Sequence, residues 1–74
     1  MNQKEFIELI KSIGFKLNDL GIYEFKEFKI SLWIYDYNFL NGYEWNRYNY
    51  NDLKPIEKHF KNEIRSIKLK ELLK

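Results

Sequence analysis

The chain has 74 residues, of which 45% are hydrophobic and 32% charged, and its formal net charge is +2. A chain this short buries only about 60% of its unfolded surface, so residues 1–74 are predicted to form a single domain. It has no cysteine and one histidine, which excludes disulfides, thiolate metal sites and any site that needs two imidazoles. No apolar run approaches the roughly 18 residues of a membrane span, and no signal peptide opens the sequence. We therefore expect a cytoplasmic protein without a membrane partner.

The composition is skewed in a way that limits what abundance can indicate. Lysine, isoleucine, asparagine, tyrosine and phenylalanine supply 40 residues, and alanine, valine and threonine are absent. The favoured residues have A/T-rich codons, which indicates an AT-rich bacterial host genome. Aromatic or basic residues therefore point to function by their position on the fold, and not by their number.

The first segment is predicted to be a helix over residues 2–13. Asn2 and Glu5 have the spacing of a capping box, and apolar residues recur on one stripe from Phe6 to Ile13. Gly14 stands where a helix C-terminus favours a left-handed residue. Residues 15–21 are predicted to form a connector, with Phe15, Leu17 and Leu20 as core anchors.

Residues 22–50 alternate between polar and aromatic or β-branched residues, which predicts three antiparallel strands near 22–25, 28–40 and 43–50. A turn at Lys26-Glu27 would place Phe25 opposite Phe28, with two further pairs behind them. Asn41-Gly42 is the strongest hairpin signal in the chain and predicts a two-residue turn.

The last segment is predicted to be a second helix. Asn51 or Asp52 caps it and Pro55 lies in its first turn. Its apolar stripe comprises Leu53, Ile56, Phe60, Ile64 and Ile67. Leu69, Leu72 and Leu73 depart from this stripe, which predicts a bend or break near Ser66. The predicted fold is α+β, a two-layer sandwich of helix, three-stranded antiparallel meander and helix, with both helices on one face of the sheet.

The predicted register distributes side chains between the two faces of the sheet. Aliphatic residues gather on one face together with Tyr43, Trp45, Arg47 and Asp36, and we expect the helices to cover that face. The opposite face would carry six aromatic residues: Trp33, Tyr35, Tyr37, Phe39, Tyr48 and Tyr50. An exposed patch of this kind indicates a partner-binding surface. Two alternatives are a bulge that exchanges the faces and a C-terminal tail, Leu69–Lys74, that covers this one.

A second candidate surface is a basic stripe on the C-terminal helix. Its members recur every three or four residues over ~21 Å: Lys54, Lys58, Lys61, Arg65 and Lys68. Such a stripe suits phosphates or an acidic protein surface. The alternative is an ordinary solvated face filled from a lysine-rich codon pool.

No catalytic constellation, phosphate loop or metal-ligand spacing is present in the sequence, and we expect neither enzymatic activity nor a cofactor nor a metal. His59 is predicted to pack beside the apolar stripe, and Asp36 with Arg47 to form a cross-strand ion pair.

The helix–three strands–helix order resembles that of double-stranded RNA-binding domains. Lys54 and Lys58 near the start of the second helix match the basic residues that this family presents to phosphates. The resemblance implies nucleic-acid binding. Asn41-Gly42 makes a tight hairpin where the family has a Gly-Pro-containing loop.

In size and layout the chain also resembles the small phage and mobile-element inhibitors of bacterial defence, anti-CRISPR proteins among them. This resemblance implies a stoichiometric inhibitor that binds a larger host protein or ribonucleoprotein complex. The leading prediction is therefore a non-enzymatic protein-interaction module. The alternatives are a nucleic-acid-binding domain that uses the basic stripe and a homodimer through the aromatic sheet face.

Overall fold

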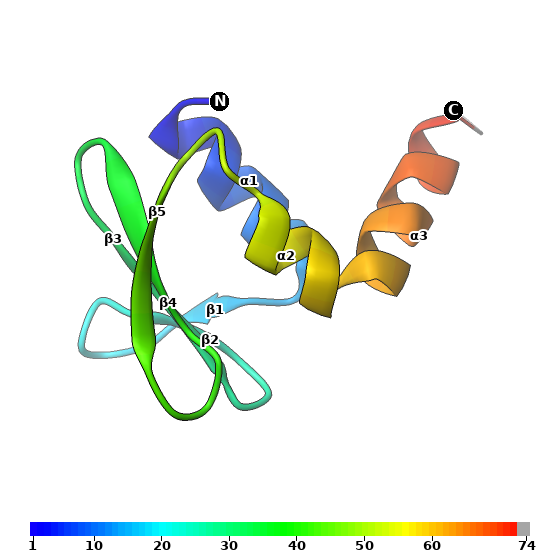
Figure 1. Ribbon diagram of the computed structural model, residues 1–74. Helices are drawn as coiled ribbons and strands as arrows, with labels where there is room; N and C mark the ends of the chain where they lie inside the picture. The colour runs from blue at the N-terminus through cyan, green and yellow to red at the C-terminus, as the bar shows by residue number, and fades with distance from the viewer. Residues whose placement is uncertain (73–74) are drawn as a thin grey trace.

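A computed structural model describes the backbone of residues 1–72 and the side chains of residues 1–67. The fold is α+β, with five antiparallel strands in the order β1-β2-β3-β4-β5 and three helices. In chain order the elements are α1 (Gln3–Ile13), β1 (Lys16–Leu17), β2 (Tyr23–Phe25), β3 (Phe28–Leu32), β4 (Asp36–Leu40), β5 (Trp45–Asn49), α2 (Lys54–His59) and α3 (Lys61–Leu72). Figure 1 shows α1 and α2 on one side of the sheet and α3 beyond them. The prediction of three strands and two helices in two layers is therefore wrong in its details.

The first helix is confirmed, with its start one residue later than predicted. The Asn2 side chain accepts a hydrogen bond from the Glu5 amide at 2.8 Å, and the Asn2 amide donates to the Glu5 carboxylate at 3.3 Å. This reciprocal capping box satisfies two of the free amides at the helix start. Gly14 ends the helix with φ of 135°, and its amide donates to the Ile10 carbonyl at 3.1 Å.

The connector that follows α1 contains an unpredicted edge strand. The Asn18 side chain accepts hydrogen bonds from the amides of Leu20 and Ile22, each at 2.9 Å, and this local turn folds β1 back onto β2. Phe15 is buried as predicted, at 2% exposure. Leu17 and Leu20 are exposed and are not core anchors, because Leu17 lies on the short edge strand and Leu20 in the turn that follows it.

The β2–β3 hairpin is confirmed to the residue. Phe25 pairs with Phe28, Glu24 with Lys29 and Tyr23 with Ile30. Lys26 adopts the positive φ of 56° that a two-residue turn requires.

The predicted long central strand is wrong, because the chain reverses between Trp33 and Asp36. The Trp33 amide donates to the Asp36 carbonyl at 2.8 Å, and Ile34 and Tyr35 form the exposed tip of this turn. Leu32 consequently pairs with Tyr37. Directly opposite residues share a face, so even-numbered residues face the core in β3 and odd-numbered residues do so in β4.

The β4–β5 connection is a four-residue loop instead of the predicted two-residue turn. Leu40 pairs with Trp45, so the register differs by two residues from the predicted one. A shift of two leaves every side chain on the same face, so the alternation in the sequence could not distinguish the two registers. In the observed register Tyr37 and Tyr48 lie opposite each other, with ring centroids 5.7 Å apart.

The predicted second helix is divided at Phe60, not at Ser66. The predicted cap at Asn51 or Asp52 is wrong, because the N-cap residue is Leu53 and the helix has no side-chain capping hydrogen bond. The Asp52 side chain does accept a hydrogen bond from the Lys54 amide at 3.2 Å, and Pro55 lies in the first turn as predicted. Phe60 leaves helical geometry, with φ of −125° and ψ of 33°, and α3 starts in a new direction (Figure 1). The tail alternative, Leu69–Lys74, concerns side chains outside the described residues.

The core lies between the sheet and the helices and is rich in aromatic rings. Phe60 contacts Phe15, Phe28 and Phe39 edge-on, with centroid distances of 5.3, 4.9 and 6.4 Å. Phe6 of α1 lies 4.3 Å from the ring of Tyr37. The Tyr37 hydroxyl donates to the Asp52 carbonyl at 2.7 Å, which ties the sheet to the start of α2.

Candidate functional site

The face of the sheet that points away from α1 and α2 is the candidate site, and we call it the open face. No helix covers it in the part of the chain that the structure describes (Figure 1). Alternation along β3, β4 and β5 assigns to it Ser31, Trp33, Asp36, Asn38, Leu40, Trp45, Arg47 and Asn49.

Trp33 and Arg47 form the centre of the open face. The Arg47 guanidinium carbon lies 5.2 Å from the centroid of the Trp33 ring, within cation–π range. Arg47 Nε lies 3.9 Å from a carboxylate oxygen of Asp36. The predicted Asp36–Arg47 ion pair is therefore confirmed. It is diagonal, since Asn38 stands opposite Arg47, and it lies on the open face and not at the edge of the core.

The backbone beneath Trp33 is fixed by contacts to other elements. Its carbonyl accepts hydrogen bonds from the Tyr50 hydroxyl and from the Gln3 side chain of α1, the latter at 3.1 Å. The Trp33 side chain nevertheless remains 51% exposed. The structure thus presents a large aromatic ring to solvent on an anchored support.

The prediction of one exposed face with six aromatic residues is wrong. Tyr37, Phe39 and Tyr50 are at most 3% exposed, and Tyr48 is half-buried beside them. The turn at Ile34-Tyr35 moves these rings under the helices, because it exchanges the faces of every residue that follows it. Only Trp33 and Tyr35 remain exposed, Tyr35 at 80%.

Sequence reasoning assigned Trp45, Arg47 and Tyr43 to the covered face, and the structure places all three in solvent. Trp45 is 45% exposed and Tyr43, in the β4–β5 loop, is 97% exposed. One signal could have revealed the error: the predicted covered face held Asp36 and Arg47, and such charged residues are rarely buried.

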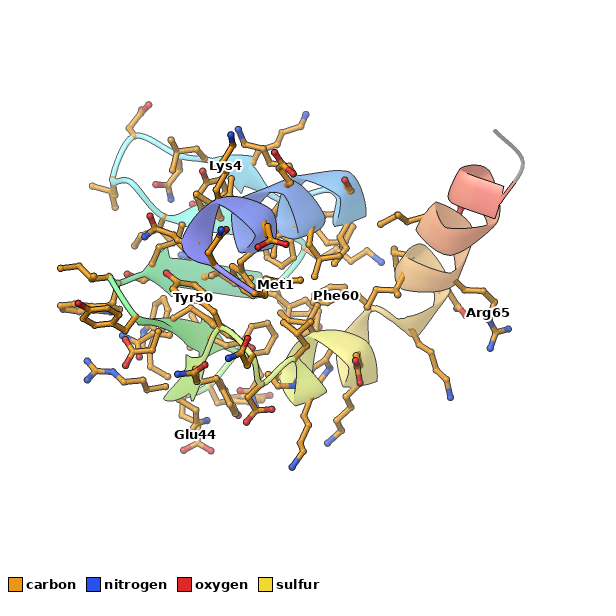
Figure 2. All side chains as sticks on the ribbon, turned by 90° about the horizontal axis from the view of Figure 1, so that it is seen from above. Met1, Lys4, Glu44, Tyr50, Phe60 and Arg65 are labelled. Carbon is orange, nitrogen blue, oxygen red and sulfur yellow. The ribbon has the colours of Figure 1, made fainter. Side chains whose placement is uncertain are left out.

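The basic stripe is divided by the break at Phe60. Lys54 and Lys58 lie on α2, whereas Lys61 and Arg65 lie on α3, and all four are exposed. Among the described side chains, no carboxylate lies within 4 Å of any of them. The side chain of Lys68, the fifth predicted member, lies outside the described residues. Figure 2 shows Arg65 pointing outward from α3, at the far end of the molecule from Glu44 of the β4–β5 loop.

His59 and Tyr37 both have structural partners. The exposed His59 ring packs 4.9 Å from Phe28 and 5.7 Å from Phe39. Burial, followed by the charge of Asp52 and the proximity of Tyr48, raises the pKa of the Tyr37 phenol well above its usual range, so it stays a hydrogen-bond donor. Among the side chains of residues 1–67, no cluster of three acidic, histidine or cysteine residues could hold a metal. Within residues 1–72, no helix combines the length and hydrophobicity needed to cross a membrane.

No family model, curated protein or solved structure matches this chain.

Proposed function

We propose that the chain is a non-enzymatic protein-binding module and that the open face is its binding surface. The observation that carries this proposal is the Trp33–Arg47 pair. Both side chains are about half exposed, at 51% and 59%, and their 5.2 Å contact holds them together. Tryptophan and arginine are among the residues most enriched at the energetic centres of protein interfaces.

Contacts that hold Trp33 and Arg47 in place lower the conformational-entropy cost of binding a partner. Asp36 restrains Arg47, and hydrogen bonds from Gln3 and Tyr50 restrain the backbone of Trp33. Side chains that are already ordered lose little conformational entropy when a partner binds. Trp45 extends the surface two residues along β5 on the same face.

The charge of the open face favours a protein over a nucleic acid as its partner. Arg47, Lys29 and Lys16 are partly balanced by Asp36 and Glu24, which leaves a net charge of +1 on the strands of this face. Surfaces that bind DNA or RNA are much more positive than this. In line with the resemblance noted in the sequence, the first partner to test is a larger host protein or ribonucleoprotein complex of a bacterial defence system.

Affinity capture with paired variants tests the proposal. Immobilised wild-type protein is compared with Trp33→Ala/Arg47→Ala and with Lys61→Glu/Arg65→Glu, first on bacterial lysate and then on each purified candidate. Circular dichroism verifies that each variant is folded. We expect the first variant alone to lose its partner. Loss confined to the second variant would contradict the assignment to the open face.

A nucleic-acid-binding module is the second candidate, and it is favoured by four exposed basic side chains that have no carboxylate within 4 Å among the side chains of residues 1–67. Its test is fluorescence polarisation with labelled single- and double-stranded DNA and RNA at low and physiological salt. Binding that weakens steeply with salt and disappears in Lys61→Glu/Arg65→Glu would establish this function instead. Unchanged polarisation at micromolar protein would leave the basic side chains a role in solvation or in steering the encounter.

A further inference from the structure

The two edges of the sheet differ in a way that points to a second interaction surface. One edge, β1, has only two residues. The other edge, β5, has five residues and pairs with β4 along its whole length, and it has no strand on its outer side among residues 1–72. Four of these five residues are exposed and Tyr48 is half-buried.

The β5 edge lacks most of the features that prevent strand pairing between molecules. Native sheets protect long edges with proline, charged side chains (lysine above all), bulges or a covering segment. Residues 45–49 contain one charged residue, Arg47, and neither proline nor lysine, and their five consecutive pairs with β4 show no bulge. Their outward amide and carbonyl groups are therefore available to another strand.

We propose that β5 pairs antiparallel with β5 of a second copy of this chain, centred on Asn46, so that two sheets join into one. In this arrangement Trp45 of each copy stands opposite Arg47 of the other. The contact is self-complementary, as a two-fold interface requires, and it occurs twice. A cation–π pair directly across two strands is a favourable cross-strand contact.

The alternative centres are less favourable. Centring on Arg47 would place this cation opposite itself, and like charges directly opposite each other destabilise a sheet. Centring on Tyr48 would pair residues 47–49 and would leave Trp45 outside the contact. Centring on Asn46 pairs residues 45–47 of the two copies and places two neutral amide side chains together, and these can exchange hydrogen bonds.

The Arg47 guanidinium can accommodate this second contact. The guanidinium group is planar, and its carbon lies 5.2 Å from the centroid of the Trp33 ring of the same chain. The Arg47 side chain is 59% exposed, so Trp45 of the second copy can approach it from across the edge. Directly opposite residues of paired strands point to the same side of a sheet, so the open faces of the two copies would form one continuous surface in the dimer.

Sedimentation equilibrium over a wide range of protein concentrations, without any partner, tests this inference. We expect the wild type to dimerise. Trp45→Lys should abolish dimerisation because the new ammonium faces Arg47, whereas Trp45→Glu should retain it because the new carboxylate faces the same group. Leu20→Lys, an apolar-to-lysine change at an 83% exposed residue in the turn between β1 and β2, near the other edge of the sheet, is the matched control and should still dimerise. A monomeric wild type, or variants at position 45 that behave alike, would overturn the proposal.

Disulfide trapping tests the register independently. The chain has no cysteine, so Asn46→Cys introduces a single thiol that would meet its own copy across the two-fold axis. Mild oxidation should convert this variant into a covalent dimer. Asn49→Cys, exposed on the same strand, should remain largely without a covalent cross-link because it has no thiol opposite it. Equal cross-linking of the two variants would contradict the Asn46-centred pairing.

Discussion

Both faces of the sheet carry aromatic side chains, and they use them differently. On the covered face, Tyr37 and Phe39 are at most 2% exposed and pack against α1 and Phe60. On the open face, Trp33 and Trp45 are about half exposed, and Trp33 contacts a charged side chain instead of an apolar core. The difference shows that aromatic content alone does not identify a binding surface, because the same residue types stabilise this fold from one face and are available to a partner on the other.

The largest expected effect is on the covered face, at the joint between α2 and α3. Phe60 is 1% exposed and contacts rings from three other segments. Figure 2 shows it at the joint, beside α1. Phe60→Ala should lower the free energy of unfolding by about 3–5 kcal/mol, since it removes a large buried ring and leaves a cavity. Urea denaturation measures this loss. Tyr43→Ala, at a fully exposed ring, is the control and should change the stability little.

An intermediate effect is expected where α1 ends against the covered face. A β-carbon at Gly14 would lie 2.8 Å from Cε1 of Phe25, and the residue has φ of 135°. Gly14→Ala should therefore cost about 1–3 kcal/mol of stability from the strained backbone, and more from the clash. Gly42→Ala separates the two causes, because Gly42 also has positive φ but has no atom within 4 Å of such a carbon. If thermal unfolding shows equal losses for both variants, the contact with Phe25 is not important.

A smaller effect should follow from removing one hydroxyl on the covered face. Tyr37→Phe deletes the hydrogen bond to the Asp52 carbonyl and should cost about 1 kcal/mol at neutral pH. Folding raises the pKa of this phenol, so the folded protein keeps it neutral where the unfolded chain ionises it. Its contribution is fully present below about pH 10 and is lost as the pH rises further. Stability measured against pH should therefore fall less steeply above pH 10 in Tyr37→Phe than in the wild type; parallel curves would contradict this.

The smallest effect on stability is expected on the open face. Trp33→Ala should cost only about 0.5–1 kcal/mol, the value of an exposed cation–π contact. The same substitution should greatly weaken capture of a protein partner, because interface tryptophans contribute far more to binding than to folding. A loss of stability as large as that of Phe60→Ala would show that the two faces do not differ as described.

The sequence predicted the segments whose structure depends on near neighbours. The capping box of α1, its glycine C-cap and the complete β2–β3 register need only contacts within a few residues, and all are confirmed. The α+β class followed from the two helical stripes around an alternating segment. Tyr37, Phe39, Tyr48 and Tyr50 were misassigned together because a single missed turn, at Ile34-Tyr35, exchanges every face after it.

Two features depend on contacts between distant segments and were decided only by the tertiary structure: the reversal at Ile34-Tyr35 and the break at Phe60. Ile34-Tyr35 contains no residue that favours a turn, yet the reversal there brings Tyr37 and Phe39 under α1 and Phe60. The break at Phe60 has no glycine or proline to mark it, and it keeps the Phe60 ring in the core while α3 changes direction. Local propensities determined the ends of α1 and the β2–β3 hairpin. Burial of the aromatic rings fixed which face they occupy, because their contacts join segments far apart in the chain.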